Sequence, residues 1–356
     1  MFEKFTNSFN KINIKPILFT SKSNHSLLFL LIKIILKKIF FIDKIYIRLI
    51  FLFNKNIRFC YVQNLYPNFD KNILNYLIKK NVIVFFRISN YRLICPNSYM
   101  YRENKICTEC MNGKISNVIK YNCENNFIKS IFSYFRTRDL NLIKNLSNIN
   151  FIVQTKYQKE FFSNLHNYKL NKFFIIHNFV QKNLEMKKII IPFKKFFLLS
   201  GRNHESKGFE QIIQFFMKNK KHNLIVTSKQ NISNISDNIK FVGYLTQNEN
   251  FYLISKAQGI IFNSQWLDVC PNIILETMAL KKIIISNYVD SLKEILIPNK
   301  TCLNFHDEKT FKTQLELVAN KKFDKNIVHN AKDMILNYFS EEQFIYSLKK
   351  IFNNSN

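Results

Sequence analysis

The 356-residue sequence has few acidic residues, and it lacks several patterns that mark common functions. Only 24 Asp and Glu residues stand against 53 Lys and Arg, which leaves a formal net charge of +29. There is no Gly-Arg tract, zinc-finger spacing or aromatic motif of an RNA-recognition domain, so specific nucleic-acid recognition has no support. No Ser-His-Asp order or hydrolase pair of carboxylates is evident. The positive charge instead predicts attraction to anionic lipid headgroups or phosphate-bearing substrates.

Cysteine is also sparse, and its placement is uneven. Seven cysteines in a chain of this length do not indicate a disulfide scaffold. Four of them, Cys95, Cys107, Cys110 and Cys123, fall in one polar stretch, residues 95–123. Cys107 and Cys110 have a spacing that chelates zinc, and the two outer cysteines would complete a tetrahedral set. The stretch is a candidate structural zinc site, with free thiols or a disulfide as the alternatives.

Short apolar runs alternate with helical patterns along most of the chain. Strands are predicted at 57–62, 82–87, 150–154, 172–176, 196–200, 223–227, 239–243, 259–263, 282–286 and 301–305. Helices are predicted at 70–80, 126–146, 156–165, 207–219, 247–257, 271–281, 290–297, 308–320, 325–338 and 341–353. Such alternation is typical of parallel sheets covered by helices on both faces. The length suits two domains of this α/β class.

Two of only five glycines bracket a basic loop, Gly201 to Gly208, which contains Arg202 and Lys207. The loop follows a short apolar strand and precedes an amphipathic helix. Ligands collect at the carboxyl ends of strands in open α/β sheets, and a helix start favours phosphate. Arg202 can bind two phosphate oxygens, and Lys207 supplies a point charge. We therefore interpret this loop as a candidate diphosphate-binding site.

A second segment places two carboxylates around a predicted helix start. Asp268 precedes Pro271, Asn272 and Ile273, and Glu276 follows one to two turns into the helix. Proline suits the first helical turn because it lacks the N–H that would be unpaired there. The two carboxylates can hold vicinal hydroxyls at opposite ends of a ligand. Each charge alone would be an ordinary surface group, but together they predict a pocket for a sugar attached to a nucleotide diphosphate.

Residues 196–296 resemble the donor domain of retaining glycosyltransferases of family 4, a group 1 glycosyl transferase family. The resemblance implies the GT-B fold, in which two Rossmann-like domains flank a cleft, here with a shortened or atypical N-terminal domain. It implies that the donor is bound by Gly201, Arg202, Lys207, Asp268, Pro271, Asn272, Ile273 and Glu276. Arg202, Lys207 and Asp268 are the implied catalytic residues, and the two cations make a catalytic metal unnecessary.

This sequence departs from the family pattern at several places, of which the start of the chain is the largest. The first of the two acids is Asp268 where the family usually has Glu, and residues 283–294 lack the family's glycine-rich loop. Segments 62–67 and 89–97 resemble the acceptor side, where Ser89, Asn90 and Tyr91 are the candidate residues. Ser89 stands where the family usually has histidine. An alternative is therefore a degenerate, noncatalytic relative that binds nucleotide sugar or acts as a partner subunit.

The start of the chain, within residues 26–53, is an apolar run interrupted by five basic residues, and four of them, Lys33, Lys37, Lys44 and Arg48, would share one side of a helix. A membrane-spanning helix would bury those charges at about 2.5–3.5 kcal/mol each. The segment therefore suits either a membrane interface or an ordinary helix packed on the acceptor sheet. A cleavable signal peptide is not indicated, because no small-residue cleavage site follows.

The resemblance and the patterns together predict the organisation and the function. The predicted parts are a basic amphipathic segment at 1–54, an acceptor-side Rossmann-like domain at 55–180, a linker at 181–195, a donor-binding domain at 196–335 and a C-terminal helix at the domain junction, 336–356. We expect sugar transfer, with retention, from a nucleotide-diphosphate donor to a lipid-linked or polysaccharide acceptor in cell-envelope glycan synthesis. The expected location is the cytoplasm, with peripheral contact to an anionic membrane. A third hypothesis is a basic protein that binds nucleic acid or a membrane surface in a salt-sensitive way and has no affinity for nucleotide sugars.

Overall fold

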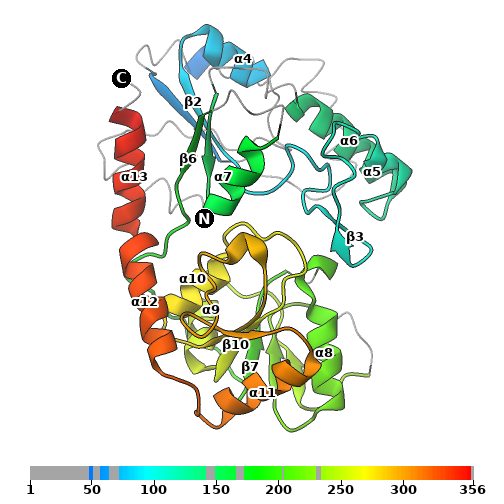
Figure 1. Ribbon diagram of the computed structural model, residues 1–356, viewed down its shortest axis with the longest axis vertical. Helices are drawn as coiled ribbons and strands as arrows, with labels where there is room; N and C mark the ends of the chain where they lie inside the picture. Colours follow the sequence, from blue (N-terminus) through cyan, green and yellow to red (C-terminus); the bar gives the residue numbers. More distant parts are fainter. Residues whose placement is uncertain are drawn as a thin grey trace. The chain divides into compact units, whose positions relative to one another are not determined.

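The computed structural model describes residues 48–50, 57–63, 72–141, 149–165, 172–202, 204–229 and 234–353 (Figure 1). These residues divide into two compact units. The first comprises the described residues up to Met100, Cys107–Ile176 and those from Lys349 onward, and the second comprises Tyr101–Ile106 and His177–Leu348. Apart from the helical residues 48–50, the predicted N-terminal segment lies outside the described residues. The predicted linker and domain boundaries stay predictions.

The first unit is built on a four-stranded parallel sheet in the order β1-β2-β5-β6. Its strands are β1 (Phe59–Val62), β2 (Ile83–Arg87), β5 (Ile149–Val153) and β6 (Lys172–Ile175). Its helices are α4 (Asn72–Lys79), α5 (Asn117–Lys120), α6 (Phe127–Asn141) and α7 (Lys156–Ser163). The inner strand β2 is almost wholly apolar because a parallel strand is covered on both faces.

The second unit is built on a six-stranded parallel sheet in the order β12-β11-β10-β7-β8-β9. Its strands are β7 (Phe197–Leu199), β8 (Leu224–Val226), β9 (Ile239–Phe241), β10 (Gly259–Phe262), β11 (Ile284–Asn287) and β12 (Leu303–Phe305). Its helices are α8 (Phe209–Lys218), α9 (Gln247–Lys256), α10 (Asn272–Ala279), α11 (Glu308–Ala319) and α12 (Asn326–Tyr338). The order reverses between β7 and β10, which is where open α/β sheets bind ligands.

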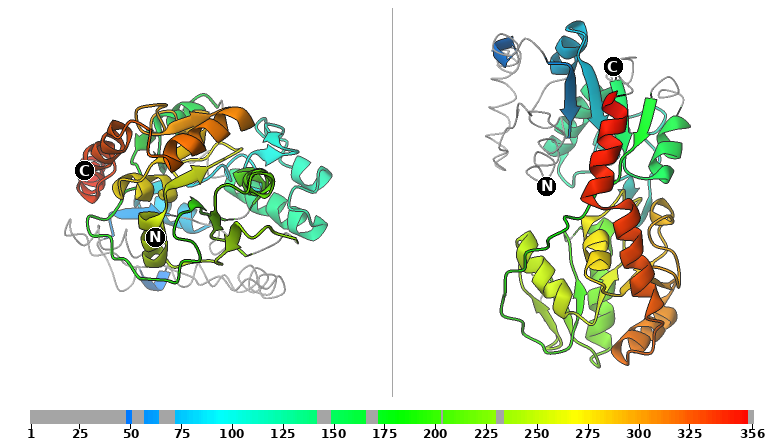
Figure 2. Two further views of the ribbon diagram at one scale, coloured as in Figure 1. Left: turned by 90° about the horizontal axis from the view of Figure 1, so that it is seen from below. Right: turned by 90° about the vertical axis from the view of Figure 1, so that its left-hand side faces the viewer.

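Alternate residues of β7 supply the two faces of the second sheet. Phe197 and Leu199 pack into a cluster with α8 and α11, whereas Leu198 packs with α9 on the opposite face. Helix α12 packs on α10 (Figure 2). All three β7 residues are fully or almost fully buried, which anchors the loop that follows the strand.

The last helix, α13 (Glu341–Asn353), extends into the part of the chain that belongs to the first unit. There, Phe352 packs against Phe59 and Phe85 with ring centroids 5.0 and 5.1 Å apart. A hairpin of β3 (Tyr101–Arg102) and β4 (Lys105–Ile106) interrupts the cysteine-containing stretch. None of the helices in the described part of the chain combines the length and the apolar character needed to cross a membrane.

The predicted helix at 290–297 is wrong. The structure has only a 3-10 turn at Asp290–Leu292, followed by turns whose N–H groups at Ile295 and Leu296 both donate to the carbonyl of Leu292. Pro298 bars a helix from continuing through the end of the predicted range, because its ring disfavours helical backbone at Ile297. Pro271 also differs slightly from its predicted place: it is the extended residue directly before α10 and not the first helical residue.

Candidate functional site

The basic loop joins β7 to α8 and passes close to the end of β10. Gly208 has φ +58°, in the left-handed region, and a Cβ there would collide with the side-chain amide and the carbonyl oxygen of Asn263. The Asn263 amide donates to the Gly208 carbonyl and to the side chain of Gln211, both at 3.0 Å. Glycine at this position therefore allows the close approach that fixes where the loop enters α8.

Lys207 forms an ion pair with Asp268, 61 residues later in the chain. Ser264 also donates to the Asp268 carboxylate at 3.2 Å, and Ser291 donates to its backbone carbonyl at 2.6 Å. The Asp268 side chain is only 8 % exposed, and that of Lys207 is 20 % exposed. One predicted cation and one predicted acid thus lie together at the carboxyl edge of the second sheet.

Aromatic rings also surround the Lys207 ammonium group. Its nitrogen lies 5.2 Å from the ring centroid of Trp266 and 5.7 Å from that of Phe262. Rings at this distance attract a cation through their quadrupole. The Asp268 carboxylate and the rings of Trp266 and Phe262 therefore fix the position of the Lys207 ammonium group. Part of the Lys207 side chain stays accessible.

The other charged residues predicted to bind the donor, Arg202 and Glu276, are not part of the Lys207–Asp268 ion pair. Arg202 is exposed, and the neighbouring Asn203 lies outside the described residues. Glu276 is buried in α10, and its carboxylate accepts a hydrogen bond of 2.8 Å from Gln247 at the start of α9. The N–H of Gly201 donates to the hydroxyl of Thr227 at 3.2 Å, so this hydrogen bond connects the loop to the residue that follows β8. Of the four charges, the structure directly joins Lys207 and Asp268.

The start of α10, which lies between Asp268 and Glu276 in the sequence, is contacted by a polar side chain from residues near His177, in the second unit. The side chain of Asn178 donates to the carbonyl of Cys270 at 2.7 Å. Pro271 follows, and then Asn272 and Ile273 begin α10, with Ile273 packing against the core. The N–H groups of this first turn are of the kind that binds phosphate oxygens.

The predicted acceptor-side residues follow β2 in the first unit. Ser89 is exposed, and the Asn90 side chain accepts a hydrogen bond from the N–H of Arg92 at 3.0 Å. Tyr91 is fully buried and packs edge-on against Phe161, with centroids 5.3 Å apart. Tyr91 therefore supports this loop from within, and only Ser89 and Asn90 of the three present accessible surface.

The four predicted zinc ligands are neighbours in the first unit, and all are free thiols. Burial, together with nearby thiols of the same group, raises the pKa of Cys95 to about 11 and that of Cys110 to about 12. The backbone N–H groups of Met100 and Asn97 act in the opposite direction on Cys95. As they are placed, no group of three or more Cys, His, Asp or Glu side chains within the described ranges is arranged to hold a metal.

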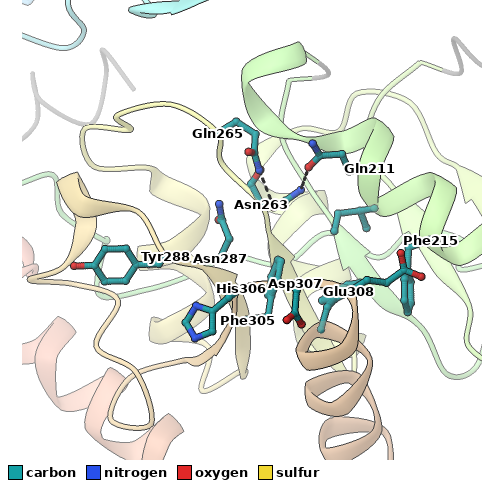
Figure 3. A pocket seen from close by; sticks show the side chains of 12 residues that line it. Gln211, Phe215, Asn263, Gln265, Asn287, Tyr288, Phe305, His306, Asp307 and Glu308 are labelled. Carbon is teal, nitrogen blue, oxygen red and sulfur yellow. Dashed lines mark hydrogen bonds between the residues drawn. The ribbon is translucent and has the colours of Figure 1, made fainter. Parts of the chain in front are cut away.

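A cavity of about 450 Å³ opens beside the basic loop, at the carboxyl ends of β10, β11 and β12 (Figure 3). Asn263 separates it from Gly208, and Asn287 and His306 lie on the adjacent strand ends. Sequence reasoning did not identify these residues. The available signal was an amide side chain at the end of each of two buried strands, Asn263 and Asn287.

Solved structures share this arrangement at low sequence identity. Sucrose-phosphate synthase from Thermosynechococcus elongatus is 14% identical, with a TM-score of 0.58 over 83% of this chain and 73% of the other. HepE from Anabaena, solved in complex with UDP-glucose, is 10% identical, with a TM-score of 0.59 over 83% and 79%. A glycosyltransferase from Rickettsia africae is 15% identical, with a TM-score of 0.58 over 98% and 87%. The class defined by fold is therefore GT-B.

The sequence of the second unit matches one family model. Residues 180–334 match the family of glycosyl transferases group 1, and no curated protein matches the chain. The matched range contains the basic loop, the Lys207–Asp268 pair and the start of α10. This part of the chain is therefore similar to the glycosyl transferases of group 1.

Proposed function

We propose that the protein transfers a sugar from a nucleotide-diphosphate donor, with retention of configuration, to a lipid-linked or polysaccharide acceptor in cell-envelope glycan synthesis. The expected place of action is the cytoplasmic face of an anionic membrane. The ion pair of Lys207 and Asp268 at the carboxyl edge of the second sheet is the observation that carries the proposal. The HepE structure with UDP-glucose supports a nucleotide sugar as the donor.

In the proposed reaction, Lys207 and Arg202 bind the donor diphosphate together with the first N–H groups of α10. The bond between the sugar C1 and the diphosphate oxygen breaks, and its electron pair leaves with the nucleoside diphosphate. The acceptor oxygen bonds to C1 from the same face, and its proton passes to the departing phosphate. In this proposal Lys207 lowers the barrier by placing its positive charge near the oxygen on which negative charge develops.

The carboxylates have complementary roles in this proposal. Asp268 holds the Lys207 ammonium, and it is proposed to accept a hydrogen bond from a sugar hydroxyl. Glu276, held by Gln247, is proposed to accept from the ribose hydroxyls. The shorter reach of Asp268, compared with the Glu that the family usually has, keeps it within contact of Lys207 and Ser264.

A thermal-shift panel of nucleotide-diphosphate sugars tests the donor proposal. At a concentration 100 times its Kd, the true donor should add about 2.7 kcal/mol to the free energy of unfolding, because it binds only the folded chain. Glu276→Gln should weaken binding by roughly 10-fold to 100-fold through loss of a charged acceptor. Glu210→Gln, on the exposed side of α8, is the matched control. If no member of the panel raises the Tm, the donor proposal fails.

A noncatalytic relative remains the second candidate, favoured by the exposed Ser89 at a position where the family usually has histidine. Both candidates predict donor binding, so turnover must separate them. We expect release of nucleoside diphosphate when the donor is offered with an acceptor extract. Binding without any release, under conditions where the protein is folded, would support the partner-subunit function.

We also propose that Cys95, Cys107, Cys110 and Cys123 hold a structural zinc ion. Their mutual proximity supports it. Because no three of these side chains are arranged to hold a metal as they stand in the described residues, zinc binding would have to rearrange them. The donor set of four sulfurs is one that tetrahedral zinc prefers.

Metal analysis of the purified chain is the test of this zinc site. About one zinc per chain is expected, and Cys107→Ser with Cys110→Ser should remove it. Cys302→Ser is the control, because that buried cysteine lies in the second unit. A wild-type protein that contains no metal after purification without chelators, and whose four thiols react freely, would contradict the proposal.

A further inference from the structure

Helix α6 has its apolar and polar faces reversed relative to an ordinary surface helix. Among residues 127–138, whose burial the structure describes, the buried positions are Ser130, Ser133 and Thr137, which are 0, 3 and 0 % exposed. Phe127 and Ile128 are 60 and 51 % exposed on the opposite side. A helix of a globular protein usually turns its apolar stripe toward the core, so this arrangement requires an explanation.

The outward face is continuous along the helix. Wound at 3.6 residues per turn, Phe127, Ile128, Ile131, Phe135 and Arg138 fall within about 100° of arc. Phe135 is 44 % exposed, and the Arg138 guanidinium lies 5.2 Å from its ring centroid. Three turns of the helix thus present apolar side chains and one cation in a single stripe.

A polar network on the inner side holds the helix in this orientation. Ser133 donates to the Glu124 carboxylate at 2.6 Å, and Arg136 donates to the Ser133 hydroxyl at 3.0 Å. Ser130 donates to Asn122 at 3.2 Å and accepts from the N–H of Glu124 at 3.3 Å. Because these contacts fix the inner side, the outward Phe and Ile side chains are not needed to position α6.

The charge around this face is positive. Residues 114–139 contain five basic residues and two acidic residues, Glu124 and Asp139. Glu124 lies 3.8 Å from Arg136 in an ion pair, so its charge is largely compensated. Lys129 and Arg138 are exposed on α6 itself. An apolar stripe with basic neighbours is the composition that binds the headgroup region of an anionic membrane.

We propose that α6 docks on an anionic phospholipid surface, with Phe127, Ile128 and Phe135 inserted among the headgroups. Charge complementarity selects this occupant over residues 1–47 of the same chain, which contain eight lysines and only two acidic residues. Helix α6 would then be the part of the protein that makes the proposed peripheral contact with an anionic membrane. The docking proposal requires no sugar transfer, so its failure would leave that activity untouched.

Vesicle flotation of the full chain tests the docking face. Wild-type protein should float with phosphatidylglycerol vesicles and much less with phosphatidylcholine vesicles, and binding should weaken with salt. Phe127→Ser with Ile128→Ser and Phe135→Ser should reduce the partition coefficient by roughly 100-fold. The control is Ile190→Ser with Leu336→Ser and Tyr338→Ser, which changes three exposed apolar residues of the second unit. Circular dichroism and Tm should show both variants folded.

A second measurement locates the contact independently of the N-terminal segment. Phe127→Trp should be quenched by brominated anionic lipid, whereas the wild-type Trp266, which is 7 % exposed, should not. The proposal is overturned if the α6 variant floats as well as wild type or if the new tryptophan is not quenched. It is also overturned if the α6 variant changes only the oligomeric state, because the face would then bind a second copy of the chain.

Discussion

Replacing Lys207 with Gln should lower the rate of sugar transfer by at least about 100-fold, with the chain still folded. Gln can still donate a hydrogen bond to Asp268, but it has no charge to place on the departing diphosphate. The carboxylate of Asp268 is 8 % exposed, so Lys207→Ala would also leave it without its cation and would confuse lost stability with lost catalysis. Initial rates with saturating donor, measured beside the Tm, separate the two effects.

Lys218→Ala is the matched control for this experiment, since Lys218 ends the same helix, α8, and is exposed. It should leave the rate and the Tm unchanged. Lys207→Arg should retain part of the activity, because the charge remains while its geometry changes. Undiminished transfer by a folded Lys207→Gln protein would mean that Lys207 does not stabilise the leaving group, and the proposed mechanism would be wrong.

Gly208→Ala should cost about 2–5 kcal/mol of unfolding free energy and most of the sugar transfer. About 1–2 kcal/mol comes from holding a residue with a Cβ in the left-handed region. A further 1–3 kcal/mol or so comes from the collision with Asn263, which includes its backbone carbonyl and so cannot be relieved by a side-chain rotation. Urea unfolding monitored by circular dichroism measures the loss.

Gly243→Ala separates the two costs of the Gly208 change. Gly243 also has positive φ, at +72°, but a Cβ there would have no neighbour within 4 Å. It should lose only about 1–2 kcal/mol. Equal losses at the two glycines would show that the approach of the loop to β10 is not tight, and the role of Gly208 in placing Lys207 would need revision.

The secondary structure was largely predictable because the local patterns and the tertiary environment agree. The short apolar runs of the second unit became β7 to β12, with ends that differ by one or two residues from the prediction. One exception is 290–297, where apolar spacing suggested a helix but the structure has only a 3-10 turn, and Pro298 restricts the backbone at the far end of the range. The β3–β4 hairpin and α5 were not predicted either.

Two features of the candidate sites could not be predicted from spacing. The direct ion pair of Lys207 and Asp268 depends on β7 and β10 being neighbours, which the order of strands along the chain does not state. Tyr91 was a candidate contact for the acceptor, yet its ring packs inside the first unit. Sequence pattern shows which residues are available, but burial decides which of them a ligand can reach.

Helix α6 shows most clearly that the sequence pattern identifies an element while the tertiary structure decides which of its faces is buried. Its existence followed from helical spacing, but its apolar stripe predicts a face turned inward, and the structure turns that stripe outward. The sequence by itself determined the α/β class, the basic loop between two glycines and the pair of acids near α10, because these depend on local spacing. Only the tertiary structure decided which charges meet and which faces stay exposed, because strand order and packing bring together residues far apart in the chain.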